Sequence, residues 1–303
     1  MPYIDTIRPL LDHVLLEKSL IEEPLAHHTS FRVGGPAEIF VKPKTTEELT
    51  KIWEICRKHN IPLTILGDGT NVLVADEGLR GIVISTNKMN EIALCGNNRI
   101  RAQAGARLSK VAEVACKAGL MGFEFASGIP GTIGGAIYMN AGAYEHDIGE
   151  FCESVTLIKD DIFVKAGTEM EFGYRKSFAQ QGGILVLEAT FQLKPGKEKD
   201  IRTKMTELNN RRRQSQPLDF PSVGSTFKRP PGYFAGKLIQ DSGLKGFTIG
   251  GAQVSEKHAG FVINTGNATA QDIFDVIEAV RKHVHEKFNV WLEPEVKILG
   301  FDS

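Results

Sequence analysis

Ser127-Gly128-Ile129-Pro130-Gly131-Thr132-Ile133-Gly134-Gly135-Ala136 is a segment with four glycines, one proline and two small hydroxyl residues. Asn140-Ala141-Gly142 follows shortly after it. Because glycine has no Cβ, a chain this rich in glycine lets its backbone approach another group closely. A ligand-binding loop is one interpretation of the segment, and a glycine-rich corner without a ligand is the other.

A second glycine-rich loop, Gly67-Asp68-Gly69-Thr70-Asn71, lies between two apolar runs. It is not the GxGxxG fingerprint, because Val72 stands at the last glycine position and a strand-like run follows instead of a helix. Successive N–H groups of such a turn can form a concave anion site, although a tight turn without a ligand is also possible. Two such loops in one half of the chain indicate an extended ligand with a pyrophosphate.

The apolar patterns around these loops predict helices and strands in both halves of the chain. We expect helices over residues 4–20, from Thr45 or Thr46, over 108–118, over the charged stretch 194–213 and from Thr269. We expect strands over residues 37–41, 62–66, 72–74, 82–84, 154–158 and 184–192. The composition changes near residue 195, and we place a domain boundary near residue 205.

Charge and composition exclude several classes of protein. The 303 residues contain 36 Lys and Arg and 37 Asp and Glu, so the net charge of −1 gives no footprint for nucleic acid or a membrane surface. The N-terminus lacks the pattern of a secretory signal, and no window reaches the ~18 apolar residues of a spanning helix. We therefore expect a cytoplasmic enzyme that acts as a monomer or weak oligomer.

The four cysteines and the histidines give no metal-ligand pattern. Cys56, Cys95, Cys116 and Cys152 form no CxxC pair, so we expect reduced thiols. His283 and His285 are two residues apart on an expected helix and face different directions. The sequence predicts neither a metal site nor a disulfide.

Six motifs in order resemble those of the UDP-N-acetylenolpyruvoylglucosamine reductase family, also called UDP-N-acetylmuramate dehydrogenases. They are Thr29–Gly35, Gly67–Asn71, Gly128–Gly135, Gly173-Tyr174-Arg175, Gly224–Lys228 and Leu292–Val296. The resemblance runs from about residue 23 to 301. It implies a first region that binds FAD, like that of the vanillyl-alcohol oxidase (PCMH-type) superfamily, with two subdomains over residues 23–205. A helix over 1–22 precedes this region, and an α+β substrate domain over 206–303 follows it.

The resemblance also implies the cofactor site. FAD is bound without a covalent link, and NADPH is its reductant. The residues implied to hold FAD are Gly67, Asp68, Gly69, Thr70, Asn71, Ser127, Gly128, Pro130, Gly131, Thr132, Gly135, Ala136 and Arg212. Arg212 lies in a run of three arginines, which could equally be a solvated helix end.

The reaction implied is the reduction of an enolpyruvyl ether of a UDP-sugar to a lactyl ether. Hydride addition places negative charge on the substrate carboxylate, and the ether-bearing carbon then needs a proton. The family motifs assign Arg175 to grip the carboxylate, Glu295 to sit near it, and Ser225 to deliver the proton. Taken alone, an arginine after a tyrosine, a Gly-Ser pair and a glutamate before a strand have ordinary structural explanations.

Substrate contacts are implied for Tyr174, Lys228, Arg229 and His258, since a diphosphate needs cations. One family branch has Asn at the position of Arg229 and Gln at that of His258. The segment between Arg175 and Ile184 is also too short for a substrate-closing tyrosine loop, so the chain resembles the type without it. Two alternatives stay open: a flavin-free UDP-sugar binding protein, and an FAD oxidase of small alcohols.

Overall fold

The computed structural model describes residues 3–10 and 19–301. Its helices are α1 (Ile4–Ile7), α3 (Thr46–Lys58), α4 (Leu108–Lys117), α5 (Ile133–Met139), α6 (Glu198–Ser215), α7 (Ala235–Asp241) and α8 (Ala270–Phe288). None of these described helices is long and apolar enough to cross a bilayer.

The first sheet has the strand order β1-β2-β5-β3. Its strands are β1 (Ser19–Pro24), β2 (Pro36–Val41), β3 (Leu63–Leu66) and β5 (Leu79–Ser85). β1 is antiparallel to β2, whereas β2 and β3 are parallel to β5. The Thr45 hydroxyl caps α3, as the sequence predicts, and the buried face of α3 packs on this sheet.

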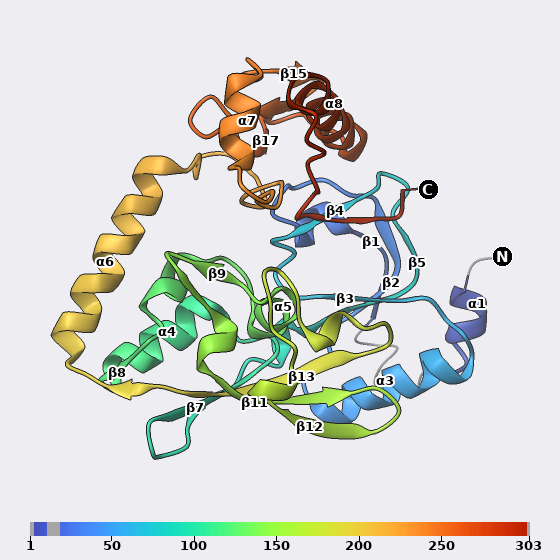
Figure 1. Ribbon diagram of the computed structural model, residues 1–303. Coiled ribbons are helices and arrows are strands. Elements are labelled where there is room, and N and C mark those ends of the chain that lie inside the picture. Colours follow the sequence, from blue (N-terminus) through green and yellow to red (C-terminus); the bar gives the residue numbers. More distant parts are fainter. Residues whose placement is uncertain (1–2, 11–18, 302–303) are drawn as a thin grey trace.

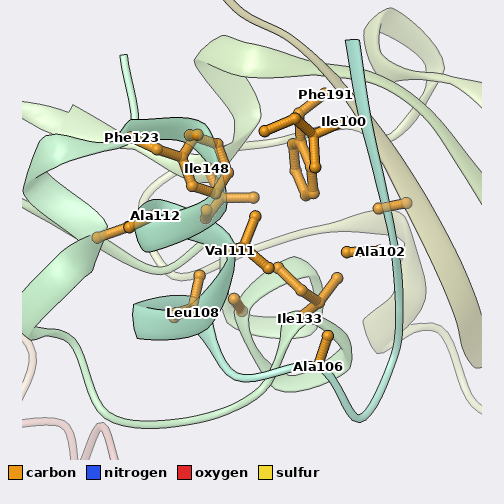
Figure 2. Close-up of a cluster of buried hydrophobic side chains, with 14 of the residues drawn as sticks. Ile100, Ala102, Ala106, Leu108, Val111, Ala112, Phe123, Ile133, Ile148 and Phe191 are labelled. Carbon is orange, nitrogen blue, oxygen red and sulfur yellow. The ribbon is translucent and has the colours of Figure 1, made fainter. Parts of the chain in front are cut away.

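The second sheet is antiparallel, in the order β12-β11-β13-β7-β6. Its strands are β6 (Ile92–Leu94), β7 (Arg99–Gln103), β11 (Cys152–Ile158), β12 (Ile162–Ala166) and β13 (Leu185–Gln192). Figure 2 shows Val111 and Ala112 of α4, Ile133 of α5 and Phe191 of β13 gathered in one core, and all four are buried. This core fixes α5 and the glycine-rich segment before it.

The third sheet, β15-β16-β17, packs on α8. Its strands are β15 (Thr248–Ile249), β16 (Ala252–Val254) and β17 (Val262–Asn264). Thr269 and Asp272 form a capping box at the start of α8, which confirms the predicted helix start. Five of the six α8 residues expected to face inward are fully buried, and Phe288 is partly buried.

Helix α6 and the C-terminal strand join the third sheet to the rest of the chain. Figure 1 shows α6 (yellow) running along one side toward the group formed by α7, α8, β15 and β17. The last strand, β18 (Lys297–Leu299), returns to pair in parallel with β4 (Val72–Val74). The Asp76 carboxylate, just after β4, accepts hydrogen bonds from the N–H groups of Ala270 and Gln271 at the start of α8.

Four short strands complete the described elements: β8 (Leu120–Met121) pairs with β14 (Lys194–Pro195), and β9 (Gly142–Ala143) with β10 (His146–Asp147). Most predicted strands are present, within one or two residues of the expected bounds. The sequence pattern did not indicate α5 or α7, each of which has only seven residues.

The predicted helix over residues 4–20 is wrong at its C-terminal end. Ile4–Ile7 is helical, but Ser19–Pro24 forms β1, because its backbone pairs with β2 instead of making hydrogen bonds within a helix. Residues 19–22 therefore belong to the first sheet. Residues 1–2 and 11–18 of the expected helix lie outside the described residues.

The boundary expected near residue 205 falls inside α6, which is continuous from Glu198 to Ser215. Ile201, Met205 and Leu208 are buried in the core of the second sheet, so this helix packs with the first region. We propose that the first region extends through Ser215 and that the substrate domain begins after it.

Candidate active site

Two cavities meet at three residues. The larger, of about 570 Å³, is lined by both glycine-rich loops, and the smaller, of about 560 Å³, by residues of the third-sheet region. Arg175, Ser225 and Glu295 are the residues that line both. The structure therefore brings together the three residues that the sequence assigns to catalysis, at the junction of the two spaces.

Glycines let the two loops approach each other more closely than residues with a Cβ would allow. A Cβ on Gly67 would lie 2.2 Å from the Thr132 hydroxyl, and one on Gly131 would lie 2.8 Å from the Thr70 hydroxyl. Gly131 also has a φ of +124°, which other residues rarely adopt. The loops Gly67–Asn71 and Pro130–Thr132 therefore pack against each other closely and line the larger cavity together.

Polar groups of this cavity lack partners within the protein. The buried hydroxyl of Thr132 and the side-chain oxygen of Gln216 make no hydrogen bond among the described residues. Burial lowers the pKa of Arg212, and no ion pair of its guanidinium is found within residues 3–10 and 19–301. Buried polar groups are almost always hydrogen-bonded, so the Thr132 and Gln216 oxygens indicate a polar ligand, and the half-buried Arg212 lines the same cavity. The Thr132 hydroxyl and the Arg212 guanidinium can both donate hydrogen bonds, so they fit an FAD diphosphate.

Most residues expected to hold the cofactor line this cavity: Gly67, Asp68, Gly69, Thr70, Asn71, Pro130, Gly131, Thr132, Gly135, Ala136 and Arg212. Ser127 and Gly128 do not. They belong to the 3₁₀ turn Glu124–Gly128, which faces α6, and the Asn209 amide donates to the Ser127 hydroxyl at 3.3 Å. A Cβ on Gly128 would lie 2.3 Å from the Asn209 side-chain oxygen, so helix packing accounts for this glycine.

Asn71 has a structural contact beyond the cavity. Its Nδ2 donates to the Glu295 carbonyl at 3.1 Å, and its own carbonyl accepts from the Lys297 N–H at 3.0 Å. The Gly67–Asn71 loop thus fixes the backbone that carries Glu295. Lys297 itself lines the larger cavity.

Arg175 lies in a tight turn and contacts Glu295. Its Nε donates to the Glu295 Oε1 at 2.5 Å, and its Nη2 donates to the Gly142 carbonyl at 3.4 Å. Burial raises the pKa of Glu295, although the charges of Arg175 and Lys228 oppose the rise. The Glu295 carboxyl is thus more easily protonated than an exposed one.

Ser225 is placed by backbone pairing on its C-terminal side. The Glu295 N–H donates to the Thr226 carbonyl at 2.8 Å, and the Lys228 N–H donates to the Glu293 carbonyl at 2.8 Å. Thr226 is fully buried, and its hydroxyl accepts from the Val262 N–H at 3.0 Å. Ser225 itself is exposed into the cavities, so a buried neighbour holds it while its hydroxyl stays free to reach a ligand.

The smaller cavity has an excess of positive charge. Arg175, Arg229, Lys237 and Lys257 line it, and Glu295 is the carboxyl among its lining residues. Burial lowers the pKa of His258. The His258 Nδ1 accepts from the Gly260 N–H at 3.1 Å, so the neutral ring keeps its proton on Nε2 as a donor.

Of the expected substrate residues, Tyr174, Arg229 and His258 line this cavity and Lys228 does not. The Lys228 ammonium pairs instead with Glu293. The Tyr174 hydroxyl accepts from the Arg229 N–H at 3.0 Å, so the two expected residues hold each other at the rim. Sequence reasoning missed Lys237 and Lys257, because single lysines in charged surface segments carry no signal of their own.

No group of three or more His, Cys, Asp or Glu side chains within residues 3–10 and 19–301 is arranged to hold a metal ion. Among the cysteines, Cys56 is buried and Cys152 is partly buried, and burial raises the pKa of each thiol to about 12. Neither thiol lines a cavity of the site.

The comparisons with known proteins agree with this geometry. Residues 37–161 match a family model described as an FAD binding domain, and residues 216–299 match the C-terminal domain of UDP-N-acetylenolpyruvoylglucosamine reductase. The chain is thus a flavoprotein oxidoreductase with an FAD-binding region and a second α+β domain, which confirms the expected fold class.

Curated relatives identify the family. The chain is 51% identical over 288 residues to a UDP-N-acetylenolpyruvoylglucosamine reductase of Clostridium perfringens, covering 94% of each chain. It is 50% identical over 293 residues to one of Caldanaerobacter subterraneus, covering 96% of this chain and 97% of the relative. A crystal structure of this reductase from Thermus caldophilus has a TM-score of 0.80 and 34% identity, with 93% and 98% of the two chains covered. The chain belongs to the UDP-N-acetylenolpyruvoylglucosamine reductase family.

Proposed function

We propose that this protein reduces UDP-N-acetyl-3-O-(1-carboxyvinyl)-glucosamine to UDP-N-acetylmuramate in the cytoplasm, with NADPH as the reductant, as a step of peptidoglycan precursor synthesis. The observation that carries the proposal is the position of Arg175, Ser225 and Glu295 at the junction of the two cavities. A cofactor in one cavity and a substrate in the other would meet at these three side chains.

The larger cavity would hold FAD. The Gly67–Asn71 loop, the Thr132 hydroxyl and Arg212 would bind its diphosphate, since all of them line this cavity and the Thr132 hydroxyl has no other partner among the described residues. When bound, FAD would supply the hydride chemistry that links the oxidation of NADPH to the reduction of the substrate alkene. We propose a non-covalent complex, because Cys152 and His146 line neither cavity.

Arg175 would bind the substrate carboxylate. A planar guanidinium pairs with a carboxylate through two parallel hydrogen bonds, and this pairing strengthens as the carboxylate gains charge in the transition state. The Glu295 carboxyl lies beside the Arg175 guanidinium, and burial favours the neutral form of this carboxyl. A neutral Glu295 would donate a hydrogen bond to the developing enediolate, whereas an ionised one would repel it.

Ser225 would donate the proton to the ether-bearing carbon. A serine hydroxyl is a weak acid, but the acceptor is a carbanion-like carbon, which takes up a proton readily. The buried Thr226 and the pairing with the Glu295 segment hold Ser225 at the mouth of both cavities. Its exposure lets the hydroxyl rotate between the substrate and solvent.

The cations of the smaller cavity would hold the uridine diphosphate. Arg229 and Lys257 supply charge, and the neutral His258 supplies one donor through Nε2. Lys237 lies beside them in an ion pair with Asp241. Arg229 stacks on the Phe234 ring at 4.0 Å, which orients its guanidinium at the cavity wall. Such an excess of positive charge suits a diphosphate and gives no obvious benefit to a small alcohol.

One assay tests the proposed function against both alternatives. Purified protein is supplied with NADPH and the enolpyruvyl nucleotide without oxygen, and NADPH oxidation and lactyl ether formation are followed. We expect equal amounts of the two. A colourless protein without extractable FAD would favour a binding protein, and NADPH oxidation that depends on oxygen alone would favour an oxidase.

A further inference from the structure

The turn that carries Arg175 has a backbone conformation that its surroundings must impose. Tyr174 and Arg175 are its central residues, and the backbones of Gly173 and Lys176 exchange two hydrogen bonds of 3.1 Å across it. Arg175 has a φ of +56°, in the left-handed region that residues with a Cβ adopt at a cost. Strain of this kind persists where neighbouring contacts hold it.

Two side-chain amides hold this turn from either side of Arg175. The Asn140 Nδ2 donates to the Gly173 carbonyl at 3.0 Å, while the Asn140 Oδ1 accepts from the Gly149 N–H at 2.9 Å. The Gln180 Nε2 donates to the Arg175 carbonyl at 2.9 Å and to the Tyr138 carbonyl at 2.7 Å. Each amide therefore links the turn to a second segment of backbone.

Both links lead to the C-terminal end of α5. Tyr138 is in its last turn, and Asn140 is the residue that ends it, with a left-handed conformation of its own. The opposite end of α5 follows Thr132, which lines the cofactor cavity. One short helix thus connects the cofactor loop to the turn of Arg175.

Neither amide lines a cavity, so neither can touch the substrate or the cofactor from its present position. Asn140 is buried, with 2% of its surface exposed, and Gln180 is half-buried. A carboxylate of the same shape has acceptors only, and it would place a lone pair against the carbonyl where the amide places a hydrogen. The donor is therefore the property that the turn requires.

We propose that Asn140 and Gln180 are positioning residues that fix the Arg175 turn, so that the guanidinium meets the substrate carboxylate in the orientation that catalysis requires. The proposal rests on the proposed function of Arg175. Misplacing a binding group by about 1 Å can slow a reaction on the order of 100-fold, so loss of either amide donor affects the step in which Arg175 acts.

The test compares Asn140→Asp and Gln180→Glu with a matched control, Gln192→Glu. The Gln192 Nε2 also donates to backbone carbonyls of a turn, those of Asn97 and Asn98. Unlike the turn of Arg175, this turn lines neither cavity. We call Asn140→Asp and Gln180→Glu the clamp variants. In anaerobic rapid mixing, we expect both substitutions to slow flavin reoxidation by the enolpyruvyl nucleotide by about 10- to 100-fold. Flavin reduction by NADPH changes less than about twofold, because it does not use Arg175, and Gln192→Glu changes neither rate.

A second measurement separates positioning from general structural damage. Combining Gln180→Glu with Arg175→Lys adds little further loss if the amide acts through Arg175, whereas independent effects multiply. Full additivity, equal slowing of both half-reactions, or unchanged reoxidation in the clamp variants would overturn the proposal. If Asn140→Asp does not fold because Asn140 is buried, Gln180→Glu alone tests the proposal.

Different results would contradict the positioning role of the two amides and the proposed function of the protein. If the wild-type protein reduces the enolpyruvyl nucleotide and Arg175→Lys is impaired, but the clamp variants react like the wild type, only the positioning role is wrong. If the wild-type protein does not reduce this nucleotide at all, the proposed function is wrong and the positioning role falls with it.

Discussion

Arg175 and Glu295 are separated by 120 positions in the chain, yet the Arg175 Nε donates to the Glu295 Oε1 at 2.5 Å. Both side chains are largely enclosed, with 18% and 14% of their surfaces exposed. A guanidinium proposed to bind the substrate carboxylate is thus already engaged by a carboxyl of the protein. When the substrate arrives, two carboxyl groups share one arginine, and the neutral form of Glu295 gains in stability.

This relationship predicts that the protein takes up a proton when the substrate binds. The pKa of Glu295 is raised by burial in the free protein, and the substrate carboxylate raises it further. Uptake therefore occurs between the pKa of Glu295 in the free protein and its higher pKa in the complex. It disappears at lower pH, where the group is already protonated, and at higher pH, where it is ionised in both states. Titration calorimetry in buffers of different ionisation enthalpy measures the uptake. Glu295→Gln abolishes it, and uptake that persists in this variant would assign the proton to another group.

Gly67→Ala tests the close packing of the two glycine-rich loops. The added Cβ meets the Thr132 hydroxyl at 2.2 Å, so Thr132 must shift within the cavity wall. We expect FAD affinity to fall at least about tenfold, the equivalent of about 1.4 kcal/mol. Gly182→Ala is the control, because a Cβ there meets nothing within 4 Å. Equal FAD affinity in both variants, measured by flavin fluorescence, would show that the Gly67 loop is only a turn.

Thr132→Val separates binding from stability. The Thr132 hydroxyl is buried without a partner, so replacing it with a methyl group removes a desolvation penalty of about 1–3 kcal/mol from the cofactor-free protein. We expect the flavin-free variant to be at least as stable as the wild type toward urea, and FAD to bind it more weakly. A variant that is less stable without flavin and binds FAD normally would contradict a ligand role for this hydroxyl.

A non-covalent flavin predicts complete release on denaturation. Cys152 donates to the Ser154 carbonyl, and His146 pairs with Glu150, so both are engaged outside the cofactor cavity. Denaturing the holoprotein and filtering it should leave all the yellow colour in the filtrate. Flavin that stays with the polypeptide would show a covalent link.

Local patterns were sufficient for much of the fold. The Thr269–Asp272 capping box and the inward face of α8 depend on residues within a few turns of one another, and both were predicted. Residues 19–22 of β1 were predicted as the end of a helix, because the pairing with β2 involves a separate segment of the chain that the local pattern does not reveal. The exposure of most of its residues also removed the alternation that marks a half-buried strand.

In the candidate site too, residues within motifs were predictable, whereas contacts between distant segments were not. Arg175, Ser225 and Glu295 were named because each stands in a family motif, but the hydrogen bond that joins two of them was not predictable from either segment alone. Ser127 was assigned to the cofactor by its position in a family motif, and its hydrogen bond with Asn209 on α6 was not predictable from that motif. The clamp amides of Asn140 and Gln180 left no signal, because an amide acts here through long-range contacts with backbone.

The most direct test of the account measures the two half-reactions of Ser225→Ala by anaerobic rapid mixing. Reduction of the flavin by NADPH needs no proton from Ser225, so we expect its rate to be nearly that of the wild type. Reoxidation by the enolpyruvyl nucleotide needs that proton, so we expect it to slow by about 10²–10⁴-fold, and Ser225→Cys to recover part of the loss. Equal slowing of both half-reactions would show that Ser225 only shapes the site, and normal reoxidation would remove it from the mechanism.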